Sequence, residues 1–159
     1  MNVSEAPVRT NAYTLHVEST TAPEFIDITD RVAAIVEESG MRNGIVVVFS
    51  KHTTAAIIIQ ENEPLLLQDM ASLIERSSPR NAHYRHNDFD VRTVHMHEDE
   101  CPNGHSHCQH LTLGTSETIP VIDGKLAIGE FQRVFMVELD HIKALEVAYR
   151  EVLVQTVGV

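Results

Sequence analysis

The chain has 159 residues, a length that suits one domain able to bury most of its apolar surface. Its composition is 43% hydrophobic with no tryptophan, which predicts an aliphatic core built from Val, Ile, Leu and Ala. The formal charge of −11 argues against a protein that binds nucleic-acid backbones, because such a protein needs a basic face.

The first part of the chain carries one strand signal and one helix signal. After a flexible N-terminus over residues 1–12, residues 13–19 alternate apolar and polar side chains, as a half-buried strand does. Thr29 or Asp30 can cap a helix whose apolar positions follow the helical period. Residues 43–44, an Asn-Gly pair, are expected to end this helix.

Two strongly apolar runs and a second helix follow. Residues 44–49 form a continuous β-branched run, which predicts a strand buried on both faces. Residues 55–60 form a similar run, and we expect this strand to lie beside the first. Pro64 suits the first turn of a helix that ends near residues 77–80.

The C-terminal part is dominated by strands. Residues 117–122 and 125–128 flank an Asp-Gly pair, a strong signal for a hairpin with a primed turn. Residues 131–138 alternate well enough for another strand, and residues 145–157 complete the sheet as one long or bent strand.

Strands outnumber helices, and hairpin connections dominate. We therefore predict an α+β protein with a single compact domain over residues 13–159, a mainly antiparallel β-sheet or sandwich, and two to three helices. No apolar run approaches the roughly 20 residues of a membrane span, and the N-terminus lacks the features of a signal peptide. We expect a cytoplasmic protein in which Cys101 and Cys108 stay reduced, and their spacing matches no usual zinc-knuckle pattern.

Histidines are concentrated in one stretch of the sequence. Seven of the ten histidines and both cysteines lie between His83 and His110. Imidazole is the commonest side-chain metal ligand. His105 and His107 would share one side of an extended segment, whereas His107 and His110 would share one face of a helix. Three histidines with an open position are the usual pattern of catalytic zinc, so we expect a metal site here.

Three other segments are candidate functional sites. His52 lies in a short loop after a buried strand, where functional residues are common. Glu61 and Asn62 likewise directly follow the next predicted strand, although they could simply cap the helix that begins at Pro64. Residues 113–116 form a small hydroxyl-rich turn that could present backbone N–H groups to an anion or be an ordinary turn.

The order of these segments resembles the secondary thiamine-phosphate synthase family, long described only as an uncharacterised protein family. The resemblance covers practically the whole chain. The motifs that carry it are His52-Thr53-Thr54-Ala55, Glu61-Asn62, Asp69-Met70, Tyr84-Arg85-His86, Asn103-Gly104-His105-Ser106-His107, Leu113-Gly114-Thr115-Ser116, Ile119-Pro120-Val121, Gly124, Gly129 and Gln132.

The resemblance implies a homotrimer with a histidine-lined pocket near the subunit contacts. It implies a metal-assisted transferase that moves an aminopyrimidine-methyl group from its diphosphate to a thiazole phosphate. The expected cofactor is a divalent metal, Zn or Mg, and the expected partner is a small phosphorylated heterocyclic substrate. By this resemblance the catalytic residues are His52, Glu61, Asn62 and Gln132, the metal ligands His52, His86, His107 and His105, and the phosphate-binding residues Gly114, Thr115, Ser116 and Arg133.

The chain departs from the family pattern at three places. Gln60 stands where the family usually has the first residue of Asn-Glu-Asn. Glu130 and Phe131 stand where the family usually has Thr-Trp. The gap between His86 and His107 is longer than usual, and we interpret residues 88–102 as a histidine-rich insertion. Two alternatives to the transferase stay open at this point: a metal-dependent phosphate-ester hydrolase, and a metal-binding trimer without enzymatic activity.

Overall fold

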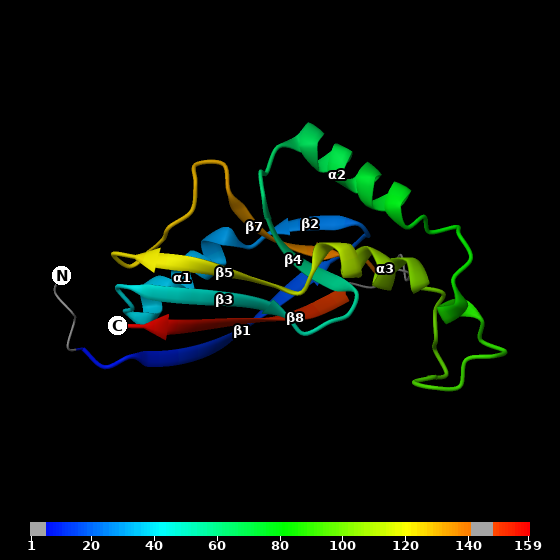
Figure 1. Cartoon of the computed structure of the whole chain (residues 1–159), viewed down its shortest axis with the longest axis horizontal. Coiled ribbons are helices and arrows are strands. Elements are labelled where there is room, and N and C mark those ends of the chain that lie inside the picture. Colours follow the sequence, from blue (N-terminus) through cyan, green and yellow to red (C-terminus); the bar gives the residue numbers. More distant parts are fainter. Residues whose placement is uncertain (1–5, 141–147) are drawn as a thin grey trace.

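The computed structural model describes residues 6–140 and 148–159. Within this part the chain forms a single α+β domain (Figure 1), as predicted. The elements are β1 (Arg9–Ser19), β2 (Glu24–Asp27), α1 (Thr29–Ser39), β3 (Gly44–Ser50), β4 (Ala55–Gln60), α2 (Pro64–Ser77), the 3₁₀ turn η1 (Arg85–Asn87), α3 (Gly104–Leu113), β5 (Ser116–Ile122), β6 (Lys125–Leu126), β7 (Arg133–Glu138) and β8 (Ala148–Gly158).

The strands form two antiparallel sheets. The larger sheet has the order β1-β8-β3-β5-β6, and the smaller one has the order β2-β7-β4. The prediction that β4 lies beside β3 is therefore wrong: residues 51–54 carry the chain from one sheet to the other. In the larger sheet β3 pairs instead with β5 and β8, which come from the C-terminal half.

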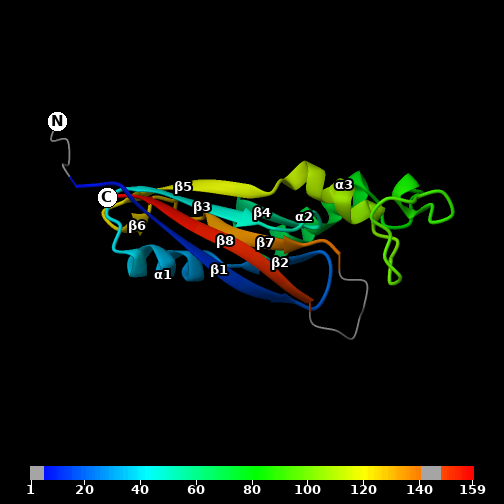
Figure 2. The same ribbon diagram turned by 90° about the horizontal axis from the view of Figure 1, so that it is seen from below.

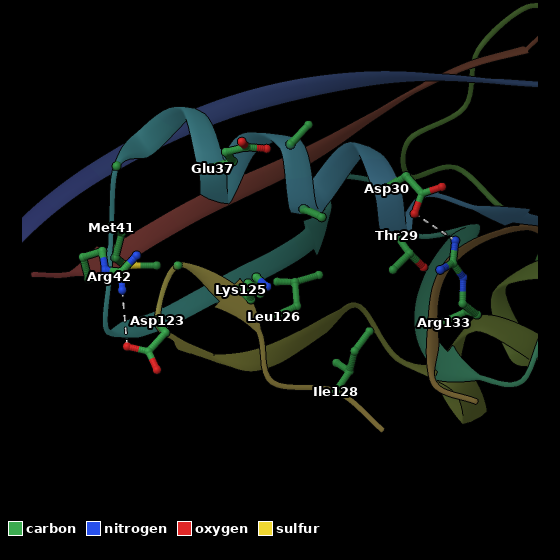
Figure 3. A pocket seen from close by; sticks show the side chains of 14 residues that line it. Thr29, Asp30, Glu37, Met41, Arg42, Asp123, Lys125, Leu126, Ile128 and Arg133 are labelled. Carbon is green, nitrogen blue, oxygen red and sulfur yellow. Dashed lines mark hydrogen bonds and ion pairs between the residues drawn. The ribbon is translucent and has the colours of Figure 1, made fainter. Parts of the chain in front are cut away.

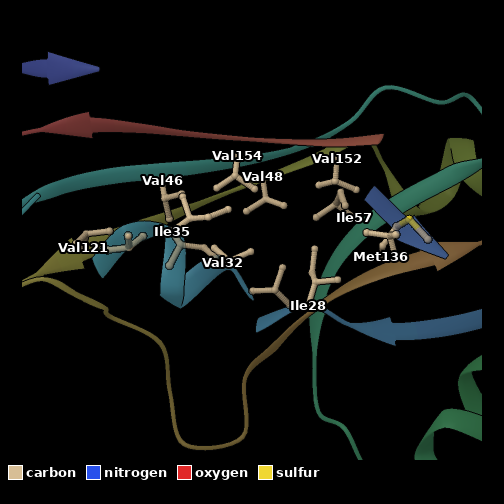
Figure 4. Packing of buried hydrophobic residues seen from close by; sticks show 14 of the residues in the cluster. Ile28, Val32, Ile35, Val46, Val48, Ile57, Val121, Met136, Val152 and Val154 are labelled. Carbon is tan, nitrogen blue, oxygen red and sulfur yellow. The ribbon is translucent and has the colours of Figure 1, made fainter. Parts of the chain in front are cut away.

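The main core lies between the larger sheet on one side and α1 with the smaller sheet on the other (Figure 4). Val32, Ile35 and Val36 come from one face of α1, as the helical period of the sequence requires. They meet Val46 of β3 and Val154 of β8, which are fully buried. This packing fixes α1 beneath the larger sheet (Figure 2).

A second, smaller core covers the other face of the three-stranded sheet. Phe135 and Val137 of β7 pack there with Ile74 of α2, and Leu113 of α3 packs against this cluster. The smaller sheet is thus buried on both faces, and α2 and α3 form its outer layer. Among the described residues, no helix is both long and apolar enough to cross a membrane.

The outward face of the larger sheet is open in the single chain. The prediction that residues 44–49 are buried on both faces is wrong, because Ile45 and Phe49 are 40% and 41% exposed. The strand register places these two side chains on the same face as Ile122 of β5 and Tyr149 of β8, which are also exposed. Four exposed apolar side chains therefore lie on the sheet face that points away from the core.

Element ends follow local chemistry, with some shifts from the predicted positions. Helix α1 ends at Ser39, four residues before the predicted break, because Gly40 adopts a left-handed conformation with φ of 69°. Strand β1 begins at Arg9 inside the segment predicted to be flexible, and it pairs with the end of β8. The predicted start of the last strand at residue 145 lies outside the described residues.

The structure confirms the predicted turn of the hairpin. Asp123 and Gly124 have φ of 52° and 78°, the positive values that a type I′ turn requires. Helix α2 begins at Pro64 as predicted, and its N-terminal N–H groups are capped by Glu63, whose carboxylate accepts from the amides of Leu65 and Leu66. Capping therefore does not occupy the side chains of Glu61 and Asn62.

Candidate functional site: a cavity beside helix α1

A cavity of about 700 Å³ lies between α1 and the β5–β6 hairpin (Figure 3). Its floor is aliphatic, with Ala33 and Ala34 from α1 facing Leu126 and Ile128. Six charged side chains surround this floor: Asp30, Glu37, Arg42, Asp123, Lys125 and Arg133. The cavity therefore combines an apolar surface with both signs of charge.

Backbone contacts fix the two walls of the cavity relative to each other. After Gly40 ends α1, the chain turns so that the carbonyl of Arg42 accepts from the amide of Gly124 at 2.9 Å. The amide of Asp123 also donates to the side-chain oxygen of Asn43 at 3.4 Å. The hairpin turn is thereby tied to the segment that follows the helix.

One end of the cavity carries two cationic side chains, those of Arg42 and Lys125. Arg42 Nη2 lies 3.4 Å from Asp123 Oδ1, and the two side chains are 65% and 78% exposed. Ion pairs with this exposure contribute little, at most about 1 kcal/mol. Lys125 lies on the adjoining strand β6 and lines the same cavity. This end is thus open to an anion from solution.

The opposite end is built around Arg133, whose Nε donates to Asp27 Oδ2 at 2.8 Å. Asp27 also accepts from the amide and hydroxyl of Thr29 and from Asn62 Nδ2. Burial alone would raise the pKa of Asp27, but the hydrogen bonds from Arg133, Thr29 and Asn62 outweigh it and lower the pKa to about 2. Asp27 is therefore a fixed carboxylate that holds Arg133 in place.

Arg133 separates this cavity from a smaller one of about 330 Å³, which contains two of the predicted catalytic residues. Glu61 and Asn62 line it together with Asp27 and Phe131. The third predicted residue of this region, Gln132, instead closes its own loop: its Oε1 accepts from the amide of Gly129 at 2.7 Å.

The predicted metal ligands separate into two groups. The rings of His86 and His107 lie edge to face with centroids 4.7 Å apart. Burial, and then the neighbouring His86, lower the pKa of His107, so its ring is neutral near pH 7. His105 is buried and hydrogen-bonds to Ser106, and its Nδ1 has no hydrogen-bond partner within residues 6–140 and 148–159.

His52 belongs to a different environment at the start of the 51–54 loop. Its Nε2 accepts from the amide of Glu151 at 2.9 Å, so the neutral ring carries its proton on Nδ1. Nδ1 lies 3.4 Å from Nη1 of Arg150; both nitrogens then carry hydrogen, so this contact is not a hydrogen bond. Burial, followed by Arg150, lowers the pKa of His52. This geometry leaves the ring no free lone pair for a metal.

The predicted phosphate-binding turn is used by the backbone. The amide of Gly114 donates to the carbonyl of His110 and caps α3, and the carbonyls of Gly114 and Thr115 accept from Ile57 and Ser50. Ser116 begins β5. These residues line neither of the two cavities, whereas the fourth member of the predicted set, Arg133, lines both.

Comparison with known proteins places the chain in a family. A family model described as UPF0047 protein YjbQ-like matches residues 13–159. A UPF0047 protein of Methanothermobacter thermautotrophicus is 44% identical over 117 residues, which cover 74% of each chain. The chain belongs to the YjbQ-like UPF0047 family. A second UPF0047 protein, from Archaeoglobus fulgidus, is 38% identical over 117 residues, covering 74% of this chain and 82% of that relative.

The fold is shared with solved structures. A YbjQ-like protein of unknown function from Sulfolobus solfataricus P2 superimposes with a TM-score of 0.78 at 33% identity, over 95% of this chain and 100% of that one. A hypothetical protein of Aeropyrum pernix K1 gives a TM-score of 0.75 at 30% identity, over 95% and 99%. These matches support the α+β domain predicted from the sequence.

The family assignment corrects the predicted function. The matching model and relatives are described only as UPF0047 or YjbQ-like proteins, and none of those reported above is described as a thiamine-phosphate synthase. The predicted synthase family and the predicted group transfer are therefore wrong. The alternatives, a metal-dependent hydrolase and a metal-binding trimer, gain no support from a family of unknown function.

The predicted histidine-rich metal centre is also wrong for the part of the chain that the structure describes. It contains no group of three or more His, Cys, Asp or Glu side chains placed to share a metal ion. The predicted ligands are separated in space, because His86 and His107 meet at α3 while His52, far upstream in the sequence, contacts β8.

Sequence reasoning did not identify the main cavity residues Asp30, Arg42 and Lys125. A weak signal was present, since Arg42 and Lys125 flank the helix end and the Asp-Gly turn that were both recognised. What could not be read from the sequence is that β6 returns the hairpin to α1, because that contact depends on the sheet order.

Proposed function

We propose that this protein binds a small phosphorylated heterocycle in the cavity between α1 and the β5–β6 hairpin. The observation that carries the proposal is the combination of an aliphatic floor with weakly paired cations in one cavity. Its volume of about 700 Å³ lies within the range of about 300–1,000 Å³ that is typical of small-molecule sites.

The cationic end formed by Arg42 and Lys125 suits the phosphate. A phosphate offers three acceptor oxygens and more charge than the carboxylate of Asp123, so it competes well for the Arg42 guanidinium. The exposed Arg42–Asp123 pair opens at little cost. Lys125 lies beside it on β6 and supplies a second cation.

The aliphatic floor suits the ring. Ala33 and Ala34 are small side chains on the α1 surface, and they leave space that larger residues would fill. Leu126 and Ile128 are the part of the floor that faces them. A planar heterocycle placed between the two alanines and these two side chains would be removed from water on both faces, which provides the apolar part of the binding free energy.

The expected divalent metal enters this proposal only as an ion that accompanies the ligand. Mg²⁺ commonly binds through substrate phosphates with one or two carboxylates, and it does not require a dedicated cluster of protein ligands. Glu37 lines the same cavity and would supply one such carboxylate. Of the two metals expected, Mg²⁺ is the one that fits this arrangement.

The proposal is tested by calorimetric titration of the whole protein with AMP and with adenosine, with and without Mg²⁺. AMP should bind measurably more tightly than adenosine, since only AMP carries the phosphate. Lys125→Ala should weaken AMP binding about three- to tenfold, the loss of one charge-assisted contact at a partly exposed site. Lys51→Ala, which removes a cation outside the cavity, should leave it unchanged. Equal affinity for AMP and adenosine would overturn the proposal.

We further propose that the protein is a homotrimer that buries the outward face of its larger sheet. Ile122 and Tyr149 are 57% and 64% exposed, and the strand register places them on the same sheet face as the exposed Ile45 and Phe49. Exposed apolar side chains gathered on one face mark protein contacts. Light scattering after size exclusion should give three chains, and Phe49→Lys should lower this number. A monomeric wild-type protein would contradict the proposal.

We also propose a cytoplasmic location, which the free thiols of Cys101 and Cys108 support. Fractionation of cells that produce the protein tests this location, and recovery outside the cytoplasm would contradict it.

A further inference from the structure

At the Arg133 end of the cavity, a carboxylate of the protein itself already contacts the guanidinium. Arg133 Nη2 donates to Asp30 Oδ1 at 3.1 Å, on the opposite side of the cavity from the Arg42–Asp123 pair (Figure 3). Asp30 contributes only this exposed carboxylate, whose side chain is 89% exposed. An ion pair this exposed is weak and can be replaced by an anion from solution.

The guanidinium itself is held independently of Asp30. Arg133 Nε donates to Asp27, which is 18% exposed and is fixed by further hydrogen bonds from Thr29 and Asn62. Release of Asp30 therefore leaves Arg133 in position with its Nη2 directed at the place that the carboxylate vacates. The Asp27 contact makes Arg133 a preorganised anion receptor.

We propose that the Arg133 end is a second anion subsite, in which Asp30 occupies the place of a ligand's anionic group. This inference rests on the proposed function, and it narrows the ligand class to compounds with two anionic groups, one near Arg42 and Lys125 and one near Arg133. Asp30 acts as an internal competitor at Arg133, so it lowers the advantage that a second anionic group gives a ligand.

The subsite is tested with inorganic phosphate, followed through the Nε–H signals of Arg133 and Arg42 in ¹H–¹⁵N spectra of the full chain. In Asp30→Asn the midpoint of the phosphate titration of the Arg133 signal should fall to a concentration up to about fivefold lower, because a surface ion pair no longer competes. The Arg42 signal should titrate as in the wild type.

Asp123→Asn is the matched control, because it removes the same charge from the other end of the cavity. It should lower the phosphate concentration at the midpoint of the Arg42 titration and leave the Arg133 titration unchanged. If Arg42 responds to phosphate while Arg133 stays still in Asp30→Asn, the second subsite is wrong and the proposed function stands. If neither arginine responds in any of the three proteins, both proposals fail.

A two-phosphate probe tests the ligand class. In Asp30→Asn, adenosine 3′,5′-bisphosphate should bind about tenfold more tightly than AMP, which is the gain expected from one further charge-assisted contact. The advantage should be smaller in the wild type, where Asp30 competes. The same affinity for the two nucleotides in both proteins would overturn the assignment of a two-anion ligand.

Discussion

Glu138 and Arg150 form a two-point ion pair that joins β7 to β8 inside the protein. Arg150 Nε donates to Glu138 Oε2 at 2.8 Å, and Nη2 donates to Oε1. The Glu138 side chain is completely buried and also accepts from the hydroxyl of Ser19 at 2.7 Å. Burial would raise the pKa of Glu138, but Arg150 and Ser19 outweigh it, so the pKa is lowered and the carboxylate is ionised.

Removing one partner of this pair should destabilise the fold strongly. Arg150→Met leaves the buried carboxylate of Glu138 without its counter-charge, and we expect the free energy of unfolding to fall by about 3–5 kcal/mol. Urea denaturation followed by circular dichroism measures this change. Lys51→Met is the control: it breaks the exposed Lys51–Glu151 pair at 2.7 Å and should cost less than about 1 kcal/mol. Similar losses in the two variants would contradict the assigned role of the buried pair.

Asp27 should make the protein lose stability in acid. Its pKa is about 2 in the folded state against 3.8 for the ordinary side chain. The folded state therefore holds the ionised form more tightly, and this contribution is present above pH 3.8 and is lost as pH falls toward 2. The shift corresponds to at most about 2.5 kcal/mol. Asp27→Asn should lower the stability at pH 6 and flatten its decline between pH 4 and pH 2.

The measurement for Asp27 is chemical denaturation at a series of pH values in both proteins. The difference between wild type and variant removes the contribution of other carboxylates, such as Glu138. A difference that stays constant from pH 6 to pH 2 would show that Asp27 does not titrate as the structure requires.

His52 should also weaken the fold when it is protonated, at a higher pH. Its pKa is lowered by burial and Arg150, so the folded state favours the neutral ring. Stability is complete above the ordinary pKa of 6.5 and falls as pH drops below it. Protonation removes the lone pair that accepts from the amide of Glu151. His52→Gln, which offers a non-titrating amide acceptor, should reduce the slope of stability between pH 7 and pH 5, and superimposable curves would refute this role.

Several elements could be predicted because their signals are local. Pro64 marks the start of α2, and the Asp123–Gly124 pair specifies a type I′ turn through its positive φ values. The apolar spacing of α1 placed its buried face correctly, with Val32 and Val36 completely buried. These features depend on the conformational preferences of a few neighbouring residues.

Other features could not be predicted because they depend on sheet order. The apolar runs of β3 and β4 look alike, yet one is open on its outer face and the other is covered on both. The ion pair between Glu138 and Arg150 joins residues of two different sheets, and neither residue stands in a recognisable motif. The family resemblance grouped His52 with His86 and His107, but the fold does not bring them together, because His52 contacts β8 while the other two rings meet at α3.

The second core offers a prediction about the layer formed by α2 and α3. Phe135 is completely buried between these helices and the smaller sheet, and its ring meets Phe25 edge to face with centroids 6.2 Å apart. Phe135→Ala should lower the free energy of unfolding by about 3–5 kcal/mol, because it removes a large apolar side chain and leaves a cavity. Leu65→Ala, at a side chain 67% exposed on α2, should change it by less than about 0.5 kcal/mol. Thermal and urea unfolding measure both variants. A small loss in Phe135→Ala would show that the outer helical layer contributes little to the cohesion of the domain.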